Sequence, residues 1–198
     1  MYVQVINGKT GDPEGLRRQL DKWREDVRPG AIGFVGSTVG VAEDGTFVAV
    51  VRFDDEAAAQ ANSSRSEQDA WWQETVKYFD GEPTFRASTD TGTIFGGGDD
   101  SAGFVQVMEG KVTDRAKAES METPEMLDQL HKARPDLLGS FRVWFADGSF
   151  LEAAYFTSEA EARKGEKSSD FEGPGEEFAE VFGEMTFVDL KNPMITSA

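Results

Sequence analysis

The chain contains no cysteine and a single histidine, His131, among its 198 residues. The absence of cysteine excludes disulfides, thiolate nucleophiles and cysteine-ligated metal sites. One histidine supplies too few nitrogen ligands for a dedicated transition-metal centre. A serine hydrolase would depend on the same residue, and no Gly-x-Ser-x-Gly motif accompanies it. We therefore expect no metal centre and no cofactor, with weak calcium or magnesium binding by carboxylates left open.

Positive charge is also scarce. Lys and Arg number 20 against 37 Asp and Glu, which gives a net charge of −17 at pH 7. Binding to a phosphate backbone requires a basic surface, so the composition argues against a nucleic-acid partner. An acidic surface of this kind is explained by solubility alone, and it does not require a salt-rich host.

Long apolar runs are missing as well. No segment approaches the ~20 apolar residues that are needed to span a bilayer. The sequence begins directly with a strand-like alternation rather than with a basic and then apolar leader. We therefore expect a cytoplasmic protein with no membrane partner.

What the chain does contain is an internal repeat. Residues 2–9, YVQVINGK, return as residues 104–111, FVQVMEGK. Further matches follow in the same order: Arg28-Pro29 with Arg134-Pro135, residues 44–47 with 147–150, and residues 81–85 with 183–187. A period of about 100 residues is longer than the ~20–50 residues of solenoid repeats, so it indicates a duplicated domain.

The first copy predicts the element order β-α-β-β-α-β. Residues 2–7 alternate as a strand, and Asp12-Pro13-Glu14 is typical of a helix start. This helix runs to Val27, and two strands, 31–42 and 46–53, follow around the turn residues Asp44-Gly45. Helical segments from Asp55 to 61 and over 67–79 precede a strand at 83–88. This order is that of a ferredoxin-like unit.

The second copy predicts the same order, with a strand at 103–109, a helix over 123–134, a hairpin of strands 138–145 and 149–156, helical segments from Ser158 and from Gly175, and a strand at 185–190. We expect two domains, 1–89 and 103–191. A flexible Gly/Asp-rich linker over 90–102 would join them, and 192–198 would form a tail.

This pattern resembles the dimeric α+β barrel superfamily, and within it the antibiotic-biosynthesis-monooxygenase-like domains. The resemblance depends on the element order and on residues 62–72, NSSRSEQDAWW, which are similar to the second-helix region of that family. Members join two β-α-β-β-α-β units, usually from two chains, so the tandem copies imply an α+β pseudo-dimer within one chain. The chain would then be a monomer or a homodimer. Members include cofactor-independent oxygenases that act on polycyclic phenols, haem-degrading enzymes and proteins of unknown activity, so the fold does not identify the function.

The oxygenase members imply a candidate site in the first copy. Their pocket lies between the helices and the sheet, where aromatic rings stack a planar phenol while an amide and a cation stabilise its oxyanion. Trp71 and Tyr78 are seven residues apart and share a helix face, whereas Trp72 and Tyr78 do not. The residues that the resemblance assigns to catalysis are Asn7, Trp71, Trp72, Tyr78 and Arg86, and those that it assigns to substrate binding are Asn62 and Phe85.

Five of these residues also have a structural explanation. One or both tryptophans and Tyr78 can be core residues, Asn62 can end a helix, and Arg86 can face solvent. Haem degradation is disfavoured because it requires a histidine on the second helix, and His131 lies elsewhere. The second copy lacks the candidate set but carries Arg142, Trp144 and Tyr155 on its central strands. We therefore predict either a monooxygenase-like enzyme acting on a small aromatic or quinone-type molecule, with the second copy as scaffold, or a non-enzymatic binding or interaction module.

Overall fold

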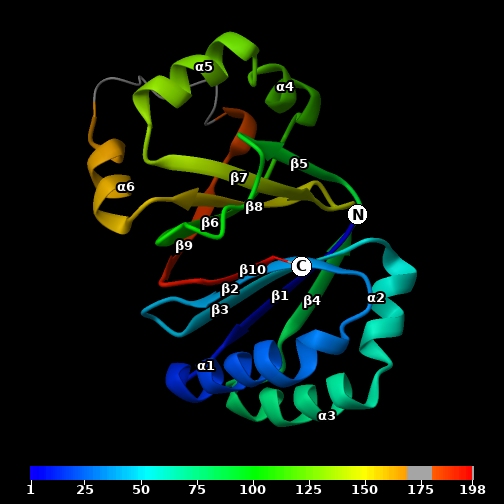
Figure 1. The fold of residues 1–198 in the computed structure, drawn as a ribbon. Helices are drawn as coiled ribbons and strands as arrows, with labels where there is room; N and C mark the ends of the chain where they lie inside the picture. Colours follow the sequence, from blue (N-terminus) through cyan, green and yellow to red (C-terminus); the bar gives the residue numbers. More distant parts are fainter. Residues whose placement is uncertain (169–179, 198) are drawn as a thin grey trace. The chain divides into compact units, whose positions relative to one another are not determined.

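The structure is a computed structural model that describes residues 1–168 and 180–197 and divides into two compact units (Figure 1). The first unit comprises Met1–Thr89 together with Met194–Ala198, and the second comprises Asp90–Pro193. The predicted α+β class and the two tandem β-α-β-β-α-β units are confirmed.

The first unit contains three α-helices and four strands from the first copy of the repeat. In chain order they are β1 (Tyr2–Lys9), α1 (Pro13–Lys22), β2 (Phe34–Val41), β3 (Thr46–Phe53), α2 (Glu56–Ser63), α3 (Ser66–Thr75) and β4 (Thr84–Ser88). Shorter helical turns are η1 (Trp23–Val27), η2 (Arg28–Gly30) and η3 (Val76–Tyr78). Helices α1 and α3 run along one face of the sheet (Figure 1).

The second unit follows the same plan. Its elements are β5 (Thr91–Ile94), β6 (Phe104–Lys111), α4 (Arg115–Ser120), α5 (Pro124–Ala133), β7 (Leu137–Trp144), β8 (Ser149–Phe156), α6 (Glu159–Glu166) and β9 (Met185–Lys191). The short helix α4 was not predicted; the Asp114 carboxylate begins it by accepting a bond from the Lys117 amide at 3.0 Å. Most of the helical segment expected from Gly175 lies outside the described residues.

Two segments differ from the expected linker and tail. Within 90–102, β5 pairs with β7, and within 192–198, β10 (Met194–Ser197) pairs with β2. The two antiparallel sheets therefore have the equivalent orders β10-β2-β3-β1-β4 and β5-β7-β8-β6-β9. Each sheet takes its fifth strand from the segment that follows the other copy of the repeat.

Local chemistry explains why the copies fold alike. Asp12 and Asp55 cap α1 and α2 by accepting bonds from the amides of Gly15 and Ala58, both at 2.8 Å. The hairpins β2–β3 and β7–β8 each turn through an Asp-Gly pair whose glycine has φ +82°. No helix within the described parts of the chain is both long and apolar enough to cross a membrane.

Candidate functional site

A cavity of about 280 Å³, called the first cavity, lies between the sheet and the helices of the first unit. The cavity is mostly apolar, and its polar groups come from a few side chains, as is usual for small-molecule sites. The side chains around it include Gln4, Ile6, Leu20, Trp23, Ser37, Val39, Phe47, Ala49, Val51, Phe53, Asn62, Gln68, Asp69, Trp71, Trp72, Thr75 and Phe85.

Three tryptophans form the helix side of the first cavity. Trp23 lies on η1, and Trp71 and Trp72 are neighbours on α3. The Trp71 ring centroid lies 6.3 Å from that of Trp23 and 5.9 Å from that of Trp72. The indole Nε1 of Trp71 donates to the carbonyl of Gln19 at 2.7 Å, and that of Trp23 donates to Oε1 of Gln68 at 2.9 Å. These bonds fix the two rings and leave their faces for apolar contact.

Phe85 on β4 also lines the first cavity although 55% of its surface is exposed. Its ring packs edge-on against Trp72, with the centroids 5.4 Å apart. A residue that lines a cavity and is exposed to water lies at an opening, so Phe85 and Trp72 flank the entrance.

Asn62 borders the first cavity, but its carbonyl oxygen is occupied by the protein. Oδ1 accepts bonds from the Ile32 amide and from the Arg65 guanidinium, each at 3.2 Å. The same Arg65 donates to the Val27 carbonyl at 3.2 Å. Asn62 is 4% exposed. It therefore holds α2 against the segment before β2, which is a structural role.

Asn7 and Arg86 do not line the first cavity. In the sheet, Val5 lies opposite Arg86 and Ile6 lies opposite Phe85. Directly opposed residues share a sheet face, and neighbours along a strand alternate. Ile6 and Phe85 therefore face the helices and the cavity, whereas Asn7 and Arg86 lie on the other face, where Arg86 Nη2 donates to Asn7 Oδ1 at 3.3 Å.

Tyr78 also lies away from the first cavity. The helix that was expected to reach it ends at Thr75, and Tyr78 lies in the turn η3. Its hydroxyl accepts a bond from Gln19 Nε2 at 3.4 Å. A Cβ added to Gly15 would lie 2.4 Å from the Tyr78 ring, so the ring packs directly on α1. Of the seven candidate residues, the structure gathers four around the cavity: Asn62, Trp71, Trp72 and Phe85.

The second unit contains a larger cavity, of about 520 Å³, called the second cavity. It lies at the equivalent place, between β6, β7 and β8 and the helices α4 and α5. Residues that line it include Gln106, Met108, Ala118, Met121, Glu122, Met126, Leu130, Arg134, Leu137, Ser140, Arg142, Phe150, Glu152, Ala154, Phe156, Phe182 and Met185.

A buried group of charges, called the Arg142 cluster, lines the second cavity and consists of Arg142, Glu152, Glu122 and Ser140. Arg142 is 9% exposed and Glu152 is 7% exposed. Nε of Arg142 donates to Glu152 Oε2 at 2.7 Å, and its Nη1 lies 2.5 Å from Glu122 Oε1. The Ser140 hydroxyl donates to Glu152 Oε1 at 2.5 Å. Every member of the cluster thus has a hydrogen-bonded partner.

The charge on Arg142 is stabilised by these carboxylates. Burial acts to lower the pKa of Arg142, but the charges and hydrogen bonds of Glu152 and Glu122 outweigh burial and raise it. The guanidinium also lies over the Trp144 ring, 5.4 Å from its centroid. Arg142 is therefore a permanent cation at the surface of the cavity.

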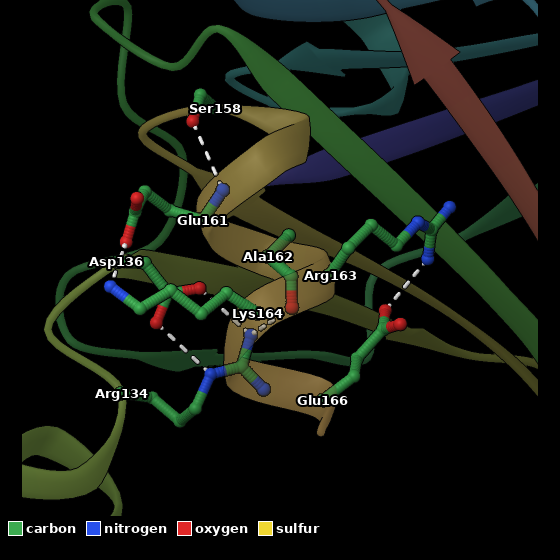
Figure 2. Close-up of polar contacts among 8 residues, drawn as sticks. All are labelled: Arg134, Asp136, Ser158, Glu161, Ala162, Arg163, Lys164 and Glu166. Atoms are coloured by element: carbon green, nitrogen blue, oxygen red, sulfur yellow. Dashed lines mark hydrogen bonds and ion pairs between the residues drawn. The ribbon is translucent and has the colours of Figure 1, made fainter. Parts of the chain in front are cut away.

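Arg134 borders the second cavity too, but it is committed to the fold. Figure 2 shows its guanidinium directed at the Asp136 carboxylate and the Ala162 carbonyl of α6. Nε and Nη2 of Arg134 donate to the two Asp136 oxygens at 3.0 and 2.8 Å, and Nη2 donates to the Ala162 carbonyl at 3.4 Å. Ser158 caps the same helix by accepting a bond from the Glu161 amide at 3.2 Å (Figure 2).

From the sequence, the second copy was predicted to be a scaffold, and neither Glu152 nor Glu122 was predicted to line a cavity. A signal was present for Glu152, because it occupies the position of Ala49, on the strand face that packs against the helices. Glu122 follows α4 in a segment with no counterpart in the first copy, so the repeat gave no guide to it. His131, by contrast, is exposed on α5, where its ring lies 5.0 Å from that of Phe95.

No protein-family description matches the sequence, and no curated protein matches it. Solved structures do match over nearly the whole chain. One is a "putative monooxygenase" from Lactobacillus acidophilus NCFM, with a TM-score of 0.74, 12% identity, and coverage of 99% of this chain and 96% of that chain. Another, from Fusobacterium nucleatum, also a "putative monooxygenase", has a TM-score of 0.74 and 9% identity, covering 99% and 94%.

A third similar structure is an "anthrone oxidase-like protein", with a TM-score of 0.63, 14% identity, and coverage of 100% of this chain and 93% of that chain. The TM-scores show a shared fold, but at identities this low the function must be argued from the residues of the site. The chain therefore has the tandem, monooxygenase-like α+β fold that the resemblance implied.

Proposed function

We propose that the protein is a monooxygenase-like enzyme that acts on a small aromatic or quinone-type molecule bound in the first cavity. The observation that carries the proposal is the group of three tryptophans at one side of an apolar cavity with an entrance at Phe85. The names of the structures that share the fold, two of them a "putative monooxygenase" and a third an "anthrone oxidase-like protein", are in keeping with this chemistry.

The residues of the cavity suggest how a flat molecule would be held. The faces of Trp71 and Trp72 would stack on its rings, because planar apolar surfaces pack favourably on aromatic side chains. Gln4 and Ser37, on the sheet side, would bond its oxygen atoms in place of Asn7 and Arg86. Asp69 is exposed at the rim, where its carboxylate could accept a proton from the substrate.

The reaction would use dioxygen as the oxidant. A ring CH₂ group of an anthrone-type substrate would lose both hydrogens and gain one oxygen atom as a carbonyl, and the second oxygen atom would leave as water. The substrate gives up four electrons and dioxygen accepts them, so the step needs no further reductant.

A second candidate is a binding module without enzymatic activity. It is favoured by the position of Asn7 and Arg86, because the cation and amide expected to stabilise an oxyanion bond each other on the opposite sheet face. In this case the tryptophans would bind an aromatic ligand and leave it unchanged.

Oxygen consumption and ligand binding, measured together, separate the two candidates. We expect an aerobic panel of anthrone-type phenols to give oxygen uptake by the intact chain, and tryptophan fluorescence to report binding. Phe85→Ala should weaken binding several-fold. Phe187→Ala is the matched control, because Phe187 occupies the equivalent strand position in the second unit and is 54% exposed. Binding without oxygen uptake would favour the binding module, and neither binding nor uptake across the panel would refute both candidates.

A further inference from the structure

We propose that the second cavity is a separate binding site for an apolar molecule that carries a protonated amine, held by the carboxylates of Glu122 and Glu152. This inference does not depend on the activity proposed for the first cavity. It gives the second copy of the repeat, which was predicted from the sequence to be a scaffold, a ligand-binding role.

The charge balance of the Arg142 cluster is the first argument. One guanidinium is shared between two carboxylates, so the formal charge of the cluster is −1. The other ion pair beside the cavity, Arg134 with Asp136, is neutral and does not compensate this charge. Burying an uncompensated charge is costly, so a ligand that brings one positive charge would be favoured.

The geometry leaves room for such a ligand to bond. An ionised carboxylate has about four lone-pair sites in total. Glu152 accepts two bonds from Arg142 on Oε2 and one from Ser140 on Oε1. Glu122 meets Arg142 through Oε1, and its side chain is 26% exposed. An ammonium group has three donors, which suits two carboxylates on either side of one cation.

The walls of the cavity define the rest of the ligand. A volume of about 520 Å³ lies within the range of small-molecule sites and is nearly twice that of the first cavity. Methionine side chains are flexible and polarisable and adapt to ligands of different shape. An apolar body of two or three fused rings is therefore expected, packed against Met108, Met121, Met126 and Met185.

A metal ion is a poorer occupant than an organic cation. Within residues 1–168 and 180–197, no group of three or more His, Cys, Asp or Glu side chains is arranged to hold a metal. Anionic ligands are disfavoured by the negative cluster and by the net charge of −17 on the whole chain.

Three probes with one naphthalene body test the proposal. They are 2-(1-naphthyl)ethylamine, 2-(1-naphthyl)ethanol and 1-naphthylacetate, measured by calorimetry with the full chain. We expect the amine to bind at least tenfold more tightly than the alcohol, and the acetate to bind weakest. Backbone amide signals of Ser140, Arg142 and Glu152 should shift on titration with the amine. Those of Ser37, Val39 and Ala49, at the equivalent positions of the first unit, should shift no more with the amine than with the alcohol.

Two single-charge variants supply the control. Glu122→Gln should weaken amine binding about tenfold, the factor expected for one charge-assisted hydrogen bond. Glu125→Gln removes the same charge from the exposed first turn of α5 and should leave binding unchanged. Circular dichroism would verify that both variants fold.

Three results would overturn the proposal. The first is equal affinity for the amine and the alcohol. The second is an equal loss of affinity in Glu122→Gln and Glu125→Gln, which would indicate general attraction to an acidic surface. The third is a set of amide shifts confined to the first unit.

Discussion

At the same register position of the two sheets, the first unit has Val39 opposite Ala49 and the second has Arg142 opposite Glu152. The surrounding framework is shared. Ser37 and Ser140 precede the pair by two residues, and both β2–β3 and β7–β8 carry an irregularity near the start of the first strand. Two substitutions within one framework thus convert an apolar cavity surface into a charged one.

The helices over the two cavities differ as well. In the first unit, η1 and α3 supply tryptophans. In the second unit, Met121 comes from the segment between α4 and α5, and Met126 comes from α5. Rigid rings suit a flat ligand of fixed shape, and flexible thioethers suit a bulkier or more variable one. The duplication therefore kept the strands and allowed each cavity to acquire its own chemistry.

The largest effect is expected when the second unit is changed toward the first. Arg142→Val alone should lower the free energy of unfolding by about 3–5 kcal/mol, because Glu152 would remain charged and buried without its cation. Adding Glu152→Ala should recover about 2 kcal/mol or more, because the uncompensated charge is then removed. Urea denaturation of the parent, both single variants and the double variant measures the coupling.

The control is the matching pair in the first unit. Val39→Ala should cost only the loss of two methyl groups, about 1–2 kcal/mol. If the double variant is no more stable than Arg142→Val, then Arg142 and Glu152 are not coupled. The proposed difference between a charged pair in the second unit and an apolar pair in the first would then be wrong.

A smaller effect on the free energy of unfolding is expected at the contacts that hold α2 in the first unit and α6 in the second. In the first unit Asn62 of α2 and Arg65, which lies just after α2, bond the segment before β2. In the second unit Arg134, which lies just before β7, packs on Gly165 of α6. A Cβ at Gly165 would lie 2.2 Å from Arg134 Nε. Gly165→Ala should therefore destabilise the protein by about 1–2 kcal/mol, although alanine alone favours a helix by about 1 kcal/mol.

Thermal unfolding of Gly165→Ala checks the sign of this change. Gly92→Ala is a suitable control, because a Cβ there would meet no atom within 4 Å. A stabilised Gly165→Ala variant would show that Arg134 moves aside freely and that its contacts with α6 contribute little.

The smallest effect concerns how each unit holds its added strand. Next to β5, Arg115 bonds the Asp90 carboxylate with Nη2 at 2.8 Å, and this bond lowers the pKa of Asp90 despite an opposing effect of burial. Next to β10, Arg28 Nη1 donates to the Ser197 carbonyl at 3.2 Å, and a carbonyl does not titrate in this range.

A carboxyl whose pKa is lowered on folding stabilises the fold above its unfolded pKa and loses that contribution as pH falls through the folded pKa. Asp90→Asn should therefore cost less than about 1 kcal/mol at pH 7, because the pair is half-exposed, and nothing well below pH ~4. The cost of Arg28→Gln should not change over the same range. Urea denaturation at several pH values measures both, and a pH-independent cost of Asp90→Asn would contradict the ion pair.

Patterns that repeat within the chain allowed the fold to be predicted. The Asp-Gly hairpins, the capped helices and the strand alternation depend on residues close together in sequence, and these elements formed as expected. The strands β5 and β10 could not be predicted in this way. Each is four residues long and becomes a strand because a distant edge, β7 or β2, supplies its hydrogen-bond partners.

The candidate site was predicted in part for a related reason. Trp71, Trp72 and Phe85 reached the cavity because helix and strand periodicity place them on the inner face. Asn7 and Arg86 belong to the opposite face, and their alternation with Ile6 and Phe85 in the sequence already carried that information. Glu152 was missed although the repeat aligns it with Ala49 on the inner strand face, where a charge is unusual. Glu122 lies in a segment with no counterpart in the first copy, and one acid among 37 gives no local signal there.

The pairing of β10 with β2 has a consequence for biosynthesis. During translation, the first 89 residues are synthesised long before Met194–Ser197. The first sheet therefore lacks its edge strand β10 until residues 194–197 have been added. Meanwhile the unpaired edge of β2 remains available to any other extended segment. The first unit is therefore completed only after the distant segment 194–197 has been made, whereas the second unit is built from one continuous stretch.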